Sequence, residues 1–232
     1  VVAEGVTQSE QNVTAIVSEN FLSDKATAAI LCKQTGAEIF PIDIGIAVDT
    51  KLENHKIAYG TKNMAKEPAM TREEAERAME VGIEKVRELS EQGYKIIATG
   101  EMGIGNTTTS SALASYFLQE DVEKMTGRGA GLTSKALEKK IAVVRKAIAD
   151  YSPAFTDAID ALAALGGFDI AGMAGVFLGG AIYRVPIVMD GFISSTAALT
   201  ATRICPACKD FIMASHVSKE PAAEKILAAM DK

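Results

Sequence analysis

The residues best suited to chemistry form a glycine loop at the start of a predicted helix. An apolar segment, 95–98, runs directly into Gly103 and Gly105, and an Asn-Thr-Thr sequence follows at 106–108. Because glycine has no side chain, the backbone approaches an anion closely there, and the unpaired N–H groups and dipole of a helix N-terminus favour negative charge. Asn and Thr are also ordinary helix caps that need no ligand, so the two glycines carry the prediction of phosphate binding.

Glu101 lies inside this loop and limits what the loop binds. A carboxylate repels a phosphate unless it faces a neutral or cationic group, such as a ribose hydroxyl or a charged heterocycle. The loop therefore suggests a nucleotide held across one turn. ATP-type and NAD-type sites lose their main support, because no Gly-Lys-Ser/Thr sequence follows and Thr108 stands where a third glycine is needed.

A second glycine loop, 126–132, precedes another predicted helix start at Thr133. Alone, this loop is equally typical of a flexible connection. The helix that follows carries three lysines, which are ordinarily solvated surface charges: Lys135, Lys139 and Lys140. Contact of one of them with a phosphate is a hypothesis.

Two further groups of residues are weaker candidates for chemistry. Asp190 and the Ser-His-Val-Ser sequence at 215–218 contain hydrolase residue types, but the chain has no Gly-x-Ser-x-Gly elbow. Cys205 and Cys208 have the spacing of a redox or metal half-site, yet a zinc site needs two more ligands and the chain has only two histidines. We predict no metal site, and we interpret the cysteines as small residues packed at a turn.

The elements that must position these residues alternate along the chain. Four apolar runs predict buried parallel strands at 38–44, 95–98, 185–189 and 211–214, and helical patterns cover 13–35, 71–92, 107–119 and 133–151. A further segment, 166–183, is rich in Gly and Ala and predicts a buried helix or a close helix–helix contact. The alternation predicts an α/β fold, a Rossmann-like parallel sheet flanked by helices, with the ligand site where the carboxyl ends of the strands converge.

Composition excludes several classes of protein. The chain has 232 residues, 48% of them hydrophobic, and a formal net charge of −6. This charge argues against a general nucleic-acid binder, and neither a membrane span nor a signal peptide is predicted. The expectation is a cytoplasmic protein with one α/β core over residues 1–232.

Four motifs together resemble one enzyme family and follow its order along essentially the whole chain. They are GEMGIGNTT at 100–108, GGFDIAGM at 166–173, DGFI at 190–193 and SHVS at 215–218. The combination resembles the nicotinate-nucleotide:5,6-dimethylbenzimidazole phosphoribosyltransferases. The resemblance implies transfer of phosphoribose from nicotinate mononucleotide to an aromatic lower-ligand base, giving α-ribazole 5'-phosphate and nicotinate in cobamide assembly. It implies no cofactor, because the glycosylated ring nitrogen of nicotinate is cationic and leaves readily, so the protein positions the base and removes one proton.

The resemblance also implies roles for particular residues. The nucleotide contacts that it implies are Glu101, Gly103, Asn106, Thr107, Thr108, Gly129, Ala130, Lys140, Asp190, Gly191 and Ser218. Ser9 and Val17 are implied at the pocket of the base. Val17 departs from the polar or larger residue that the family often has there, so the choice of aromatic base stays open.

A second departure concerns the ends of the chain. Family members extend beyond both ends, and a later Gly-Glu-Gly motif carries the proposed general base, whereas this chain ends at Lys232. The expectation is a partial chain that binds nucleotide better than it turns it over, in a homodimer by resemblance. The alternatives are a nucleotide-binding subunit completed by a partner chain and, more distantly, a small-molecule kinase.

Overall fold

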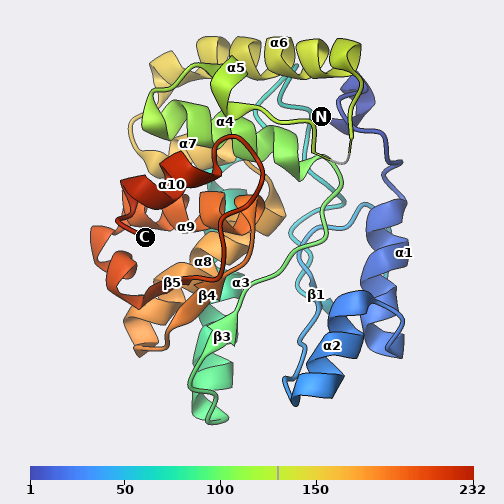
Figure 1. Ribbon diagram of the computed structural model, residues 1–232, viewed down its shortest axis with the longest axis vertical. Coiled ribbons are helices and arrows are strands. Elements are labelled where there is room, and N and C mark those ends of the chain that lie inside the picture. The colour runs from blue at the N-terminus through green and yellow to red at the C-terminus, as the bar shows by residue number, and fades with distance from the viewer. Residues whose placement is uncertain (130) are drawn as a thin grey trace.

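The computed structural model describes residues 1–129 and 131–232, and within them it shows many helices around short parallel strands (Figure 1). The longer helices are α1 (Val13–Asn20), α2 (Thr27–Thr35), α3 (Arg72–Glu91), α4 (Asn106–Leu118), α6 (Ser134–Tyr151), α7 (Ala158–Leu165), α8 (Phe168–Tyr183) and α9 (Phe192–Ile204). Shorter helical segments are η1 (Val2–Glu4), η2 (Phe21–Ser23), α5 (Val122–Met125), η3 (Ser152–Ala154), η4 (Pro206–Phe211) and α10 (Ala223–Ala229). None of the helices in the described part of the chain is long and apolar enough to cross a lipid bilayer.

The described strands form two parallel sheets. One sheet has the order β3 (Ile97–Ala98), β4 (Ile187–Met189), β5 (Ile212–Ala214), with Ile187 of β4 facing both Ile97 and Ile212. The other pairs β1 (Ile42–Asp43) with β2 (Glu53–Asn54). The α/β class and the parallel pairing are thus confirmed. The carboxyl ends of β3, β4 and β5 lie at one edge, as parallel strands require.

Helices α3 and α8 approach each other closely because glycines remove side chains from their contact. A Cβ atom at Gly82 or at Gly175 would clash with backbone carbonyl groups of the facing helix, those of Gly172 and Met79 respectively. This confirms the prediction of a buried segment near 166–183, which is a helix and also a close helix contact. Helix α3 leads into β3 and α8 leads into β4, so the two tightly packed helices precede two strands that pair directly with each other.

The remaining helices form a series beside this pair. Helix α9 packs between α8 and α4, and α4 in turn packs against α6, which lies along the top of Figure 1. Helix α4 buries the hydroxyl residues of its first turns, and Thr109 and Ser111 donate hydrogen bonds to backbone carbonyls within the helix. The N-terminus of α4 follows the carboxyl end of β3 after the short loop 99–105.

Three predictions about the elements were wrong. The helix predicted over 13–35 is two helices, α1 and α2, because Asp24 takes a left-handed conformation (φ 53°) between them. The strand predicted over 38–44 forms a ladder only at Ile42–Asp43. That ladder pairs with β2, which was not predicted, and so the four predicted strands do not share one sheet within the described residues.

A buried ion pair between Asp43 and Lys56 organises the loop that follows β1. The carboxylate of Asp43, 1% exposed, accepts hydrogen bonds from the backbone N–H groups of Gly45 and Ile46. It also accepts from Thr50 and from Nζ of Lys56, which lies 2.7 Å away. Asp43 therefore organises its own loop and is not free to contact a ligand.

We expect Gly175→Ala to lower the free energy of unfolding by about 1–3 kcal/mol, because the new methyl group meets the α3 backbone and not a movable side chain. Gly172→Ala on the same helix is the matched control. A Cβ atom there would lie 2.5 Å from Cδ1 of Ile44, the far end of a flexible side chain. Urea denaturation of both variants measures the difference. Equal stability of the two variants would contradict the account of the α3–α8 contact.

Candidate functional site

The loop between β3 and α4 brings its glycines against three other parts of the chain. Gly105 begins α4 with a left-handed conformation (φ 95°), and η1 covers it, since a Cβ atom there would lie 3.0 Å from Cγ2 of Val2. The N–H of Ile104 donates to Oγ1 of Thr14 on α1. The N–H of Gly103 donates to the Glu101 carboxylate at 3.2 Å. The loop is therefore fixed on both sides by the N-terminal segment and by its own glutamate.

One amide connects two acidic side chains at this loop. Nδ2 of Asn106 donates to Oε2 of Glu101 at 2.5 Å and to Oδ2 of Asp169 at 2.7 Å. Asp169 stands at the start of α8, so the amide joins the β3–α4 loop to a helix 63 residues later. The sequence indicated Asp169 only as part of the motif at 166–173, without a role of its own.

Burial raises the pKa of both acidic side chains at this loop. Glu101 keeps an exposed surface but is crowded by protein, and burial, followed by the nearby charge of Asp169, raises its pKa to about 7. Burial also raises the pKa of Asp169 above its ordinary value. A carboxylate with a pKa near 7 is suited to accept a proton at neutral pH.

The ends of β3 and β4 are tied together beside these acids. Thr99 Oγ1 lies 2.5 Å from Ser194 Oγ, and Ser194 Oγ accepts a hydrogen bond from the N–H of Asp190. Asp190 is exposed at the end of β4, and its charge contributes to the raised pKa of Glu101. The Nε2 atom of His216 would lie 3.8 Å from a Cβ at Gly191, so the segment after β5 reaches the same edge. Glu101, Asp190 and Gly191 thus lie together.

A buried lysine lies on the opposite side of the first turn of α4. Lys140 is 0% exposed, and its Nζ donates to Oγ1 of Thr107 at 3.0 Å and to the carbonyl of Gly127 at 3.1 Å. Burial lowers its pKa to about 8, although the charge of Glu220 opposes that effect. Of the three lysines considered from the sequence, Lys135 and Lys139 are exposed. The buried spacing of Lys140, Val144 and Ala147 is the helical signal that singles out Lys140.

The second glycine loop surrounds this lysine and introduces a carboxylate that sequence reasoning missed. The N–H of Gly129 donates to Oε1 of Glu220 at 3.1 Å, whereas Oε2 of Glu220 is buried without a hydrogen-bond partner among the described residues. Oγ of Ser218 accepts from the N–H of Glu220. Ser218 and Gly129 are thus linked through Glu220, whose only sequence signal is its place two residues after Ser218.

The N-terminal segment reaches both glycine loops. Nε2 of Gln8 donates to the carbonyl of Gly131 at 2.8 Å, which places the neighbouring Ser9 near the second loop. Val17 is three residues after Thr14 on α1, and therefore on the helix face that contacts the first loop. Both residues predicted at the base pocket are half-buried in this region.

Two of the residues predicted to bind nucleotide are not placed at the site: Thr108 points away from it, and Ala130 is not among the residues that the structure describes. Thr108 is completely buried, and its hydroxyl has no hydrogen-bond partner within the described residues, so it faces the core behind the loop. Ala130 lies outside the described residues.

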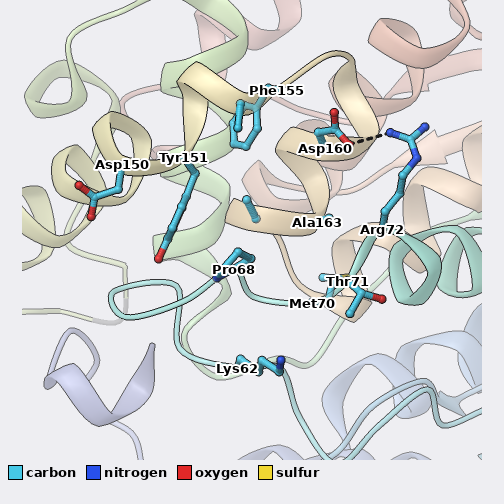
Figure 2. A pocket seen from close by; sticks show the side chains of 12 residues that line it. Lys62, Pro68, Met70, Thr71, Arg72, Asp150, Tyr151, Phe155, Asp160 and Ala163 are labelled. Carbon is cyan, nitrogen blue, oxygen red and sulfur yellow. Dashed lines mark hydrogen bonds and ion pairs between the residues drawn. The ribbon is translucent and has the colours of Figure 1, made fainter.

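Two cavities lie away from these residues. One, of about 430 Å³, is lined by the start of α3, the end of α6 and helix α7, and Figure 2 shows the ion pair of Arg72 with Asp160 at its edge. The other, of about 600 Å³, lies near β2 and α3 and includes His55 and Arg77. Neither is lined by a residue predicted from the sequence to bind nucleotide or base.

Comparison with known proteins gives consistent results. The nicotinate-nucleotide–dimethylbenzimidazole phosphoribosyltransferase of Clostridium acetobutylicum is 50% identical over 234 residues, covering 100% of this chain. The protein of the same name from Ruminiclostridium cellulolyticum is 48% identical, also over 100% of this chain. The chain spans 66% of the length of each of these relatives. A crystal structure of CobT from Thermus thermophilus matches with a TM-score of 0.95 and 35% identity, covering 100% of this chain and 70% of that one.

Parallel strands flanked by helices, with acidic residues and a glycine loop at the carboxyl ends of the strands, define the class of α/β proteins. A family model described as phosphoribosyltransferase matches residues 1–232. The chain belongs to the phosphoribosyltransferase family, which confirms the resemblance found in the four motifs.

The thiol of Cys208 is unsuited to thiol chemistry at neutral pH. Cys208 is completely buried, and burial, followed by the adjacent Cys205, raises its pKa to about 12. We expect iodoacetamide at pH 8 to leave Cys208 unmodified in the folded chain and to modify it after unfolding in urea. Peptide mass spectrometry measures both states. Rapid labelling of Cys208 in the folded chain would contradict this account.

Proposed function

We propose that this chain binds nicotinate mononucleotide and transfers its phosphoribosyl group to an aromatic base such as 5,6-dimethylbenzimidazole. The names of its relatives and its membership of the family support this reaction. The observation that carries the proposal is the division of the site into a cationic end at Lys140 and an acidic end at Glu101, on either side of the first turn of α4. A nucleotide with an anionic phosphate and a cationic ring matches that division.

The phosphate belongs at the cationic end. Lys140 is already held between Thr107 and Gly127, and Gly129 presents its backbone beside Thr107, because a Cβ atom there would lie 3.0 Å from the threonine Oγ1. Buried charge-assisted hydrogen bonds to an anion are among the stronger polar interactions in proteins. Lys140 therefore anchors the phosphate, and Ser218 and Gly129 line the same end.

The nicotinate and the incoming base belong at the acidic end. The cationic ring of glycosylated nicotinate is attracted to Glu101 and Asp190, and the free base must lose an N–H proton as its nitrogen attacks the ribose. The resemblance places the family's general base in a motif beyond Lys232, so within this chain we propose Glu101, with a pKa of about 7, as the residue that can accept the proton when that segment is absent. Ser9 and Val17 support the flat face of the base.

A single α/β core, a homodimer and a cytoplasmic location stay predictions.

The second candidate is a nucleotide-binding subunit that needs another polypeptide segment for catalysis. The fraction of the relatives' length that the chain spans, 66%, gives this candidate a specific basis. Nucleotide binding without product formation, followed by product formation after addition of the C-terminal fragment of the Clostridium acetobutylicum relative, would support it.

We expect Lys140→Met to weaken the binding of nicotinate mononucleotide by about 10-fold to 100-fold, the usual effect of losing a hydrogen bond to a charged group. Lys139→Met removes the same charge from an exposed neighbour on α6 and should leave the dissociation constant unchanged. Calorimetric titration of the three forms measures the effect. Equal affinities of the two variants would place the phosphate elsewhere.

We expect the pH dependence of kcat/KM to have an acid limb near pH 7 and an alkaline limb near pH 8. Below pH 7 Glu101 gains a proton and cannot act as a base, and above pH 8 Lys140 loses its charge. Glu101→Gln should lower the rate by about 10²–10⁴-fold and abolish the acid limb. Chromatographic detection of ribazole phosphate measures it, with Glu84→Gln on the exposed surface of α3 as the control. An acid limb that persists in Glu101→Gln would assign the base to another group.

A further inference from the structure

Asp169 is a carboxylate whose two oxygens both accept hydrogen bonds. Oδ2 accepts from Nδ2 of Asn106 at 2.7 Å, and Oδ1 accepts from the N–H of Ile170 at 2.9 Å. An asparagine has only one acceptor oxygen in its side chain. Its NH₂ group would therefore face either the Asn106 amide or the Ile170 N–H, donor against donor. A carboxylate, with two acceptor oxygens, therefore fits this position better than an amide does, and burial raises the pKa of that carboxyl group.

Two glycines hold this carboxylate in place. A Cβ atom at Gly167 would lie 2.7 Å from Oδ1 of Asp169, and a Cβ atom at Gly103 would clash with Oδ2. The glycines come from the start of α8 and from the β3–α4 loop. Asp169 thus lies between two backbone segments that are distant in sequence, and both approach its carboxylate closely because they carry glycine.

The amide of Asn106 connects Asp169 to Glu101, so the position of Asp169 also affects the hydrogen bond that Glu101 accepts. An amide nitrogen has two N–H groups, and here both are directed to carboxylates, one to Asp169 and one to Glu101. Because Asp169 accepts one of them, the amide cannot turn its oxygen toward Glu101 without losing a buried hydrogen bond. Glu101 is consequently held by a donor whose direction is set from α8.

We propose that Asp169 is a positioning residue that acts through Asn106 to fix the orientation and the protonation state of Glu101. This inference rests on the proposed function only for its consequence, proton removal from the base, because the arrangement exists in the protein without substrate. Asp169 also acts on Glu101 as a like charge. The other titratable group that faces Glu101 is Asp190 at the end of β4, and no cation is paired with Glu101 or Asp169 among the described residues.

The two partners of Glu101 affect its pKa in opposite directions. The charge of Asp169 raises the pKa of Glu101, and the hydrogen bond from Asn106 lowers it. Asp169→Asn should therefore lower the pKa of Glu101, and Asn106→Ala should raise it. A merely structural disturbance of the loop does not predict shifts of opposite sign.

The test is a pH titration of side-chain carboxyl carbons by NMR in the 232-residue chain labelled with ¹³C-glutamate, without any ligand. Glu101→Gln identifies the resonance. We expect Glu101 to titrate near pH 7 in the wild type, about one unit lower in Asp169→Asn and higher in Asn106→Ala. Asp150→Asn removes the same charge on α6, from a residue paired with Lys146, and should leave the titration unchanged.

The outcomes separate this inference from the proposed function. An unchanged Glu101 titration in both Asp169→Asn and Asn106→Ala, with folded spectra, overturns the inference even if nicotinate mononucleotide binds. The predicted shifts support it even if that nucleotide fails to bind, in which case only the proposed function is contradicted. If Asp169→Asn does not fold, the upward shift in Asn106→Ala decides alone, and its absence overturns the inference.

Discussion

The contact between α3 and α8 is the constraint on which the site depends. Backbone meets backbone there, because Gly82 and Gly175 leave no side chain between the helices. Helix α3 leads into β3 and helix α8 leads into β4, and these two strands pair directly, so the helix contact and the strand ladder together hold Glu101 and Asp190 at neighbouring strand ends. The same contact brings the first turn of α8 beside the β3–α4 loop. A wider contact would separate Asp169 from Asn106.

Much of this framework could be predicted from the sequence because it arises from local chemistry. Thr71 and Glu74 form the capping box that begins α3, which such a pair of residues indicates directly. The β3–α4 loop was predicted because glycines follow an apolar run. Helix α9 was missed because it is buried over most of its surface and rich in Ser, Thr and Ala, so it has no polar face to mark its period.

The parts of the site that could not be predicted depend on long-range packing. No local pattern says that Asp169 meets Asn106, since the partners are 63 residues apart and lie on different helices, α8 and α4, of the long connection between β3 and β4. Glu220 likewise reaches Gly129 from 91 residues away. The break between α1 and α2 depends on the left-handed backbone conformation of Asp24. The helical pattern of the sequence continues across this residue, so the pattern alone does not reveal the break. Choosing Lys140 over its neighbour requires knowing which face of α6 is buried.

The first turn of α4 is where the two charged ends meet. Asn106 and Thr107 are consecutive, and successive side chains of a helix point about 100° apart, so one turns to the acids and the other to Lys140. Thr108, a further step round, faces the core. The backbone between the two ends is continuous helix, which keeps the anionic and cationic groups at a fixed separation without any side chain bridging them. A ligand that spans the turn therefore meets a site already divided by charge, and under the proposed function this division, more than either glycine loop, sets which end of the nucleotide lies at Lys140 and which lies at Glu101.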